Sequence, residues 1–571
     1  MVSDERALAT WLAGRDDHEL AATLAARAVP ATAPWHDFFD ASEALLDAAS
    51  IDRALSRLPR TALSELRSGR PLSHPLLSRL ALIDDGGRLF GPVADRVDAL
   101  ATTRPDAFTP HPEADPPAPA GDREAATAAE RAFTTAASLA DVLLACLHAP
   151  FPRTGSGTVA AAERKRLVET GALGDDDDLE DLLIAAAAAG LAVAADRLWE
   201  VTTAGEDWLQ APSPERWARI AEGFRFALPA GLRTPDGGVV APATWPDAYP
   251  LDPEWPAKVW QIKRIGTQWG LIGTGGTEFA WTRALREGAP ADPSGLAAHL
   301  PAEIDRVYLQ ADLTAIAPGP LAPALDLRLR GIALRESRAQ ASTYRFTAAS
   351  LGAGMTEGET AASIREFLSS LSLTGIPQPL EYLIDSTAAR HGLVRVGEDP
   401  ASGRSIVSTP DRALRDTIAV DQALRPLGLV RDGDGLISRA SRDAVYWTLA
   451  DARYPVVAVD ADGAPELVRR RSAAPTAAAP QAPERTYERL ISALRSGHGT
   501  DGEEGWLGRE LEQAVRARSE IVVVVRMPDG SERSLTLEAS GLGGGRLRGR
   551  DRAADIERTL PVSSIMSVRP A

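Results

Sequence analysis

The chain has 571 residues and a formal net charge of −17 at pH 7, which argues against a protein that coats nucleic acid by bulk positive charge. Hydrophobic residues make up 44% of the sequence, and at about 150 residues per domain the length predicts roughly four domains with cores of their own. The single cysteine, Cys146, excludes a disulfide framework and favours a reducing, cytoplasmic compartment. No apolar run is long enough to cross a membrane, and the acidic start of the chain differs from a signal peptide.

Residue usage is biased along the whole chain. Lysine occurs only at Lys165, Lys258 and Lys263, whereas arginine and alanine are abundant. This bias is typical of a GC-rich genome of actinobacterial type. A single arginine is therefore weak evidence for function.

Two proline-rich polar segments, 102–125 and 469–485, predict extended linkers and divide the chain. The predicted units are an N-terminal helical, winged-helix-like domain (1–101), a winged-helix domain (126–220), a tryptophan-rich connecting region (221–300), a larger domain (301–468) and a C-terminal domain (486–571). We expect an α+β protein, mainly α, with several domains.

The N-terminal domain shows helical periodicity. Leu8, Trp11 and Leu12 have the i, i+3, i+4 spacing of one apolar helix face. Further on, two short helical segments precede the turn "DDGG" and the segment "RLFGP", which predicts a small hairpin. Helix, turn, helix and hairpin in this order indicate a winged-helix-like domain.

The domain at 126–220 repeats this plan with three helices and a wing. The third helix, which enters the DNA major groove in most winged helices, starts with the four aspartates of 175–178. Carboxylates there would repel phosphates, although Arg164, Lys165 and Arg166 on the preceding helix are candidate nucleic-acid contacts. We favour protein contact for this domain and keep specific DNA reading as the alternative.

The connecting region is rich in tryptophan, with basic residues in between. Alternating aromatic and basic residues can stack single-stranded bases, but tryptophans more often fill a small core, and we favour the core. The tryptophans are Trp245, Trp255, Trp260, Trp269 and Trp281.

Motifs of catalysis do not occur in the sequence. A motor needs a phosphate-binding loop G-x-x-x-x-G-K-[ST], and none of the three lysines follows such a loop. The stretch "GTGGTEF" has Glu278 where a dinucleotide fingerprint needs glycine, which favours a flexible turn. Histidine pairs at zinc-binding spacing and a G-x-S-x-G elbow are also missing. We therefore expect a protein that is not an enzyme, with no metal and no cofactor.

The stretch "VYLQADLTAIAPGPL" opens the domain at 301–468. Its period of two predicts one half-buried strand over Val307–Ala317, with Gln310, Asp312 and Thr314 on the polar face and Pro318-Gly319-Pro320 as its end. An aspartate at a strand end can be catalytic. Because no base, metal ligand or phosphate loop accompanies Asp312, we favour a structural or docking role.

Three motifs of this domain form a pattern: "VYLQADLTAIAPGPL", "YRFTAASL" and "IPQPLEYLID". In this order they resemble the helicase-associated domain at the N-terminus of XPB-type helicases. They are still more similar to large actinobacterial proteins that carry this domain without a motor. The resemblance is strong over residues 306–459 and moderate over the winged-helix region before it.

The resemblance implies a protein-docking module, because the corresponding domain of XPB tethers the motor to a partner protein. The implied partner is an XPB-type helicase or another DNA-processing protein, and the family supplies no catalytic residues. The predicted docking residues are Gln310, Asp312, Thr314, Tyr344, Arg345 and Gln378.

The C-terminal domain reads as strands joined by tight turns. It resembles a small β-barrel of the WYL type, although Arg546 stands in the place of the name-giving triplet and puts ligand binding of that type in doubt. Arg546, Arg548 and Arg550 alternate along one strand and are candidate nucleic-acid contacts. A solvated strand edge that deters pairing explains them equally well.

These features predict a non-motor accessory or scaffold protein of DNA repair or transcription that docks a helicase. The alternative is a DNA-binding regulator that uses the winged helices and the C-terminal barrel. No membrane role is expected.

Overall fold

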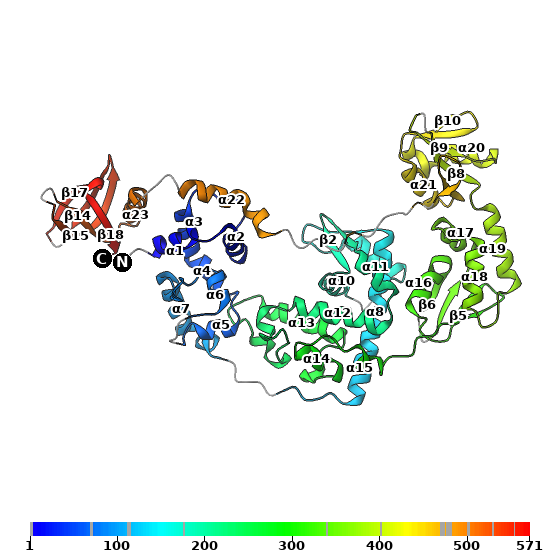
Figure 1. Ribbon diagram of the computed structural model, residues 1–571, viewed down its shortest axis with the longest axis horizontal. Coiled ribbons are helices and arrows are strands. Elements are labelled where there is room, and N and C mark those ends of the chain that lie inside the picture. Colours follow the sequence, from blue (N-terminus) through cyan, green and yellow to red (C-terminus); the bar gives the residue numbers. More distant parts are fainter. Residues whose placement is uncertain are drawn as a thin grey trace.

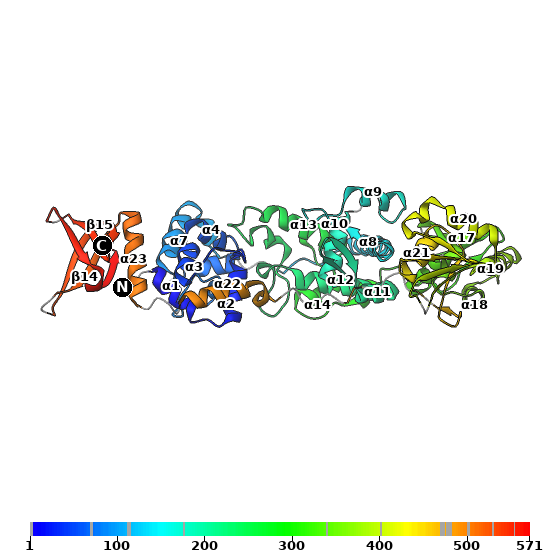
Figure 2. The ribbon, with the colours of Figure 1, turned by 90° about the horizontal axis from the view of Figure 1, so that it is seen from above.

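The computed structural model describes residues 4–68, 72–110, 116–174, 178–338, 341–399, 402–466, 468, 474–475, 482–498, 503–527, 530–552 and 554–570. Its elements form one elongated row of units (Figures 1 and 2). The C-terminal sheet lies at one end, followed by the N-terminal helices, the middle helices and the units that contain α16–α21. The row is mixed α/β with several sheets, as expected for a multidomain α+β chain.

The N-terminal unit is helical. Its helices are α1 (Asp4–Ala13), α2 (Asp17–Ala26), α3 (Phe38–Leu46), α4 (Ala48–Leu55), α5 (Arg60–Glu65), α6 (Pro75–Arg79), α7 (Gly91–Thr103) and η1 (Pro105–Phe108). The expected apolar face of α1 is buried, with Leu8 and Leu12 fully inside the core. The expected hairpin is reduced to one antiparallel bridge between Ile83 and Leu89. A winged helix remains an interpretation for this unit.

A helix from the far end of the sequence completes this N-terminal core. Helix α22 (Pro483–His498) packs on α2 and α3, and it buries Tyr487, Leu490 and Leu494 among the N-terminal side chains. The Tyr487 hydroxyl donates to the carbonyl of Val29 at 2.7 Å. Most of α22 falls within the segment 486–571, yet its apolar face belongs to the N-terminal unit.

The middle unit has the element order expected for 126–220. It contains α8 (Asp122–His148), β1 (Phe151–Pro152), α9 (Ala161–Glu169), α10 (Leu179–Ala188), β2 (Ala192–Ala195), β3 (Leu198–Val201), α11 (Thr203–Gln210) and α12 (Ser213–Ala227). The strands pair in the order β1-β3-β2, and β2 and β3 form the hairpin at the expected place of the wing. Asp175, Asp176 and Asp177 lie outside the described residues, while Asp178 caps α10.

The tryptophan-rich region packs onto the middle unit. It contains η2 (Ala230–Leu232), η3 (Pro242–Asp247), α13 (Trp255–Gln268), η4 (Thr274–Gly276), η5 (Ala280–Thr282), α14 (Arg283–Arg286) and α15 (Pro293–Ala297). Four tryptophans are buried and fill cores, as we favoured from the sequence: Trp245, Trp255, Trp269 and Trp281. Trp260 is the exception, because 62% of it is exposed.

The segment 307–390 forms a four-stranded antiparallel sheet with helices around it. Its elements are β4 (Tyr308–Leu309), β5 (Thr314–Ala317), α16 (Pro323–Ile332), β6 (Leu334–Arg338), β7 (Ser342–Arg345), α17 (Ala348–Thr356), α18 (Ala361–Leu371) and α19 (Gln378–Arg390). The strand order is β4-β5-β7-β6. Val307, Tyr344, Phe346 and Ile384 are among the buried side chains of its own core.

The prediction of a single strand over Val307–Ala317 is wrong. The chain turns back after Leu309, and β4 pairs with β5 as a tight antiparallel hairpin. Leu313 takes a positive φ of 66° at the turn, a conformation that a branched side chain rarely adopts. The alternation of polar and apolar residues continued across the turn, and it concealed the break.

The segment 394–466 forms a second small unit with a separate core. Its elements are β8 (Val394–Glu398), β9 (Ser405–Ser408), α20 (Arg412–Val420), η6 (Gln422–Leu427), β10 (Val430–Asp432), β11 (Gly435–Ser438), α21 (Arg442–Asp451), β12 (Val456–Val459) and β13 (Pro465–Glu466). The strand order is β10-β11-β9-β8-β12-β13. The predicted domain at 301–468 thus contains two hydrophobic cores.

The C-terminal unit is an open sheet with one helix on it. Helix α23 (Glu503–Ala517) covers one face of β14 (Glu520–Arg526), β15 (Glu532–Gly543), β16 (Arg546–Asp551), β17 (Ile556–Pro561) and β18 (Ile565–Pro570), and η7 (Val562–Ser564) joins the last two strands. The order β17-β16-β15-β14-β18 leaves β17 and β18 as edges within the described residues. The expected closed barrel is therefore corrected to an open sheet, in which α23 covers the apolar face.

Helix α22 lies so close to the residues just before α3 that the position of Gly497 has no room for a side chain. A Cβ at Gly497 would lie 2.2 Å from the carbonyl oxygen of His36, whereas a Cβ at Gly508 in α23 would meet nothing within 4 Å. We expect Gly497→Ala to destabilise the N-terminal unit by about 1–3 kcal/mol, because overpacking forces the two helices apart.

The matched control is Gly508→Ala, which should stabilise α23 by up to about 1 kcal/mol through helix propensity. Urea denaturation with hydrogen exchange of α2 and α3 measures the first effect, and hydrogen exchange of α23 measures the second. Equal behaviour of the two variants would contradict the close packing of α22.

Candidate docking and nucleic-acid surfaces

The polar row of the opening stretch forms the turn between β4 and β5. The Thr314 hydroxyl donates to Asp312 Oδ1 at 2.6 Å, and the Thr314 backbone N–H donates to the same oxygen at 3.2 Å. The Gln310 N–H donates to the Thr314 carbonyl at 2.9 Å and closes the turn. Gln310 and Asp312 are exposed, but Thr314 is buried, which removes it from a docking surface. These hydrogen bonds satisfy the backbone groups of the turn, as aspartate and threonine side chains commonly do in short turns.

Tyr344 is a core residue and does not belong to a docking surface. It is 1% exposed, and its hydroxyl donates to Asp326 in α16. Burial, reinforced by the charge of Asp326, raises the pKa of the Tyr344 hydroxyl well above its ordinary value. A buried hydroxyl needs such a partner, because an unpaired one costs free energy. The sequence motif "YRFTAASL" therefore contains a structural tyrosine.

Asp326 lies beside a buried cluster of charged side chains that joins two units. Asp141 of α8 is 1% exposed, and its carboxylate accepts a hydrogen bond from Arg330 Nη1 at 2.7 Å and a second from Arg335. Arg330 and Arg335 belong to α16 and β6, so the pairs join the middle unit to the segment 307–390. Two guanidinium groups on one buried carboxylate satisfy a charge that would otherwise be costly inside the protein.

Arg345 and Gln378 are closer to solvent. Arg345 pairs with Glu336 across β6 and β7 and lies 3.4 Å from the Asp312 carbonyl oxygen. Gln378 is exposed at the start of α19, and Tyr382, one turn later on the same face, is 74% exposed. Aromatic residues are enriched in protein interfaces, so Tyr382 is a candidate contact residue. Tyr382 was not among the predicted docking residues.

The basic cluster on α9 is largely neutralised. Arg166 pairs with Glu163, with a distance of 3.0 Å from Nε to Oε1, and Lys165 lies 3.7 Å from Glu169. Arg164 is half-buried on the same helix. Since each of the two pairs is local to the helix, the cluster presents less positive charge than the sequence indicated.

The predicted alternation along β16 is confirmed by the burial of its side chains. Arg546, Arg548 and Arg550 are exposed, and the residues between them are buried. Arg550 pairs with Asp555, with 3.0 Å from Nε to Oδ1. Arg546 and Arg548 have no ion-pair partner among the described residues. They are the candidates on this face whose charge remains available for a phosphate.

Trp260 is the tryptophan of this region that lies outside the core. The Arg264 guanidinium lies 4.6 Å from its ring centroid, and Arg264 also pairs with Asp178 at 2.8 Å and with the buried Asp181 of α10. The arginine is thereby held on the ring by two carboxylates. A single exposed indole offers a stacking surface for one base, whereas a single-stranded nucleic acid is bound by several such rings.

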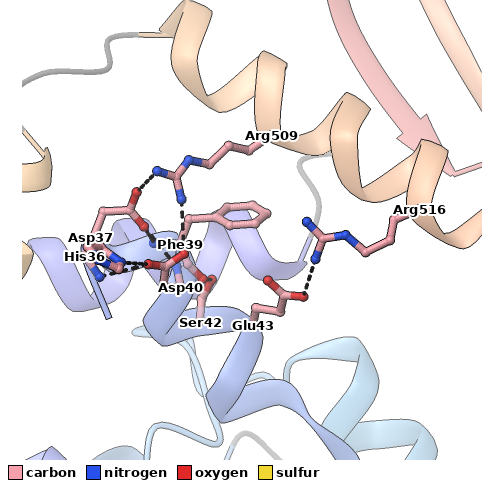
Figure 3. Close-up of polar contacts among 8 residues, drawn as sticks. All are labelled: His36, Asp37, Phe39, Asp40, Ser42, Glu43, Arg509 and Arg516. Carbon is pink, nitrogen blue, oxygen red and sulfur yellow. Dashed lines mark hydrogen bonds and ion pairs between the residues drawn. The ribbon is translucent and has the colours of Figure 1, made fainter. Parts of the chain in front are cut away.

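The C-terminal unit contacts the N-terminal unit through polar side chains (Figure 3). Arg509 of α23 pairs with Asp37 and lies 3.1 Å from Asp40, while Arg516 lies 4.0 Å from Glu43. Asp37 also caps α3, because it accepts the N–H groups of Phe39 and Asp40 at 2.9 Å. One carboxylate thus serves both the helix end and the contact between units.

Among the residues that the structure describes, no group of three or more His, Cys, Asp or Glu side chains could hold a metal ion. The helices of that part of the chain also include none long and apolar enough to span a membrane.

Comparison with known proteins gives a family match. Residues 307–432 match a family model described as "Helicase conserved C-terminal domain". The match spans the four-stranded sheet with α16–α19 and continues into the second sheet as far as β10. No curated protein matches the chain. The chain therefore contains a helicase-associated domain, which accounts for less than a quarter of its length.

The charge cluster around Asp141 was not predicted from the sequence. The available signal was a single aspartate in the apolar run "DVLLACLHAP" of a predicted helix. Such a residue needs a partner when it is buried, but the partners, Arg330 and Arg335, are almost 200 residues away in the sequence. Periodicity cannot identify contacts of this range.

The Asp141 cluster predicts strong coupling between the two units. Asp141→Asn should destabilise the contact by about 3 kcal/mol, because the two guanidinium groups lose their counter-charge in a buried place. The measurement is urea denaturation, with hydrogen exchange of α16 and β6 to identify the part that opens.

Asp385→Asn is the matched control, because Asp385 pairs with Arg365 on the surface and is 63% exposed. An exposed pair of this kind contributes about 0–1 kcal/mol. Similar losses in both variants would mean that the Asp141 cluster does not hold the units together.

Proposed function

We propose that this protein is a non-motor accessory factor of DNA repair or transcription that docks an XPB-type helicase, or a similar nucleic-acid machine, through its helicase-associated domain. The observation that carries the proposal is the match of residues 307–432 to a helicase family model. The resemblance of the three motifs in this region to the docking domain of XPB-type helicases supports the same role.

The chemistry of the region supports docking more than catalysis. Its most prominent aspartate, Asp312, accepts two hydrogen bonds from Thr314 at Oδ1, so this carboxylate has a structural role in the turn. The sequence has no phosphate-binding loop with a lysine, which a helicase motor requires. We therefore propose that a partner supplies the motor.

We assign the docking surface to the outer face of α19. Gln378 and Tyr382 are exposed there one turn apart. A tyrosine offers a large contact area at a low cost in conformational entropy, and such residues dominate many interfaces. Thr314 and Tyr344 are not part of the proposed surface because they are buried.

This assignment predicts which variants bind the partner more weakly. In a binding assay with the purified XPB-type helicase of the same organism, the double variant Gln378→Ala, Tyr382→Ala should bind at least about tenfold more weakly, in line with the removal of an interface hot spot. The fold should be unaffected, since both side chains are exposed.

Phe226→Ala is the matched control, because Phe226 is 66% exposed but lies in α12 of the middle unit. It should leave the affinity unchanged. Absence of binding by the unaltered chain would contradict helicase docking altogether, and equal affinity of all variants would contradict the assignment to α19.

A second candidate function is DNA binding by the C-terminal unit. It is favoured by the exposure of Arg546 and Arg548, which have no ion-pair partner among the described residues. Each phosphate that an arginine neutralises releases counterions, so the affinity for DNA should fall steeply with salt.

The double variant Arg546→Ala, Arg548→Ala should weaken DNA binding and flatten its salt dependence by about one unit of slope for each phosphate that is no longer neutralised. Arg552→Ala is the control, because Arg552 lies 2.9 Å from Glu538 and is already paired. Fluorescence anisotropy across a salt series measures both. Binding that does not respond to salt would contradict this candidate.

A further inference from the structure

A cleft of about 800 Å³ lies where three units meet. Its walls come from the end of α8, from α16, α17 and α19, and from the end of α21 with the loop up to Pro455. The volume is in the range of small-molecule sites, and such sites occur preferentially between domains. Neither the helicase match nor the docking surface on α19 accounts for this cleft.

The three units are held together around the cleft by specific bonds. Arg330, which lines it, also donates to Asp141 of α8 at 2.7 Å. On the other side, the Tyr446 hydroxyl of α21 donates to the carbonyl of Thr356 in α17 at 2.9 Å. The Gly392 N–H donates to the carbonyl of Pro455 at 3.1 Å. The cleft is therefore a fixed feature of the contact between units.

One wall of the cleft is shallow and lined by small side chains. Helix α17 contributes Ala348, Ala349, Gly352 and Ala353, and α16 contributes Gly331. A Cβ at Gly331 would meet nothing within 4 Å, so the space in front of it is open. Trp447 of α21 adds an aromatic ring to the lining. This combination accommodates a flat apolar group.

Two exposed arginines of the lining form no ion pair among the described residues. Arg390 and Arg453 line the cleft and have no ion-pair partner among the described residues, in contrast to Arg330. His148 and His391 also line it, although burial lowers the pKa of His391 and favours its neutral form. The acidic residues of the lining are Glu357 and Asp451. Two available guanidinium groups are typical of a site for phosphate oxygens.

The lining also includes a threonine whose hydroxyl is buried. Thr387 of α19 is 6% exposed, and its Oγ1 has no hydrogen-bond partner among the described residues. This oxygen has almost no solvent-accessible surface, so a ligand in the cleft does not reach it and it takes no part in the proposed site.

We propose that the cleft binds a phosphorylated small molecule of nucleotide size. Its flat apolar part lies against the small side chains of α17 and beside Trp447, and its phosphate lies at Arg390 and Arg453. The proposal concerns binding alone, and it does not depend on whether α19 docks a helicase.

The test is isothermal titration of the full chain with nucleoside mono-, di- and triphosphates, with inorganic pyrophosphate and with citrate as an anion without phosphate. We expect nucleotides to bind and to raise the melting temperature, since a ligand that binds only the folded state stabilises it. The double variant Arg390→Ala, Arg453→Ala should weaken the binding at least about tenfold, because charge-assisted hydrogen bonds are removed. Arg395→Ala, an exposed arginine of β8 outside the cleft lining, should leave it unchanged.

A further variant separates binding from folding. Gly331→Leu projects into the open space and should abolish binding while the melting temperature is kept. Nucleotide binding that survives Gly331→Leu, equal binding of citrate, or no nucleotide binding at millimolar concentration would each overturn the proposal.

Discussion

The arrangement of the central units depends on one buried carboxylate. Asp141 is enclosed almost completely and receives hydrogen bonds from Arg330 and Arg335, which come from a different unit. A buried ion pair contributes little net stability compared with an apolar contact, but it tolerates only one geometry. The same Arg330 lines the cleft, so the contact that fixes the helicase-associated domain also shapes the concavity beside it.

A second constraint acts from the other end of the chain. Helix α22 completes the N-terminal core, and Ala474 pairs with the end of β3, with 3.0 Å from its N–H to the Val201 carbonyl oxygen. After the helicase-associated domain the chain thus contacts earlier units twice, at β3 through Ala474 and at the N-terminal core through α22. The C-terminal sheet is then positioned by the ion pairs of Arg509 with Asp37 and Asp40 (Figure 3).

Local features of the fold were predictable from the sequence, because they depend on neighbouring residues. The buried face of α1, the alternation along β16 and the core role of four tryptophans all followed from periodicity or from the usual burial of aromatic side chains. The hairpin of β4 and β5 was missed, since the polar alternation of Gln310, Asp312 and Thr314 runs through the turn without a glycine or proline to mark it. The prediction of a closed barrel was wrong, because the sheet is open with β17 and β18 at its edges. Whether two edge strands pair depends on long-range contacts, and the turns between neighbouring strands do not determine it.

The candidate site was predictable only as a region. The three motifs lie within residues 307–432, which match the family model, but two of the six predicted docking residues, Thr314 and Tyr344, are buried, and the exposed Tyr382 of the proposed surface was not among the six. The central claim, docking of a helicase through this domain, is tested most directly by hydrogen exchange of the full chain with and without the purified XPB-type helicase. The account predicts slower exchange along α19 in the complex. Unchanged exchange throughout 307–466, with protection elsewhere in the chain, would contradict it.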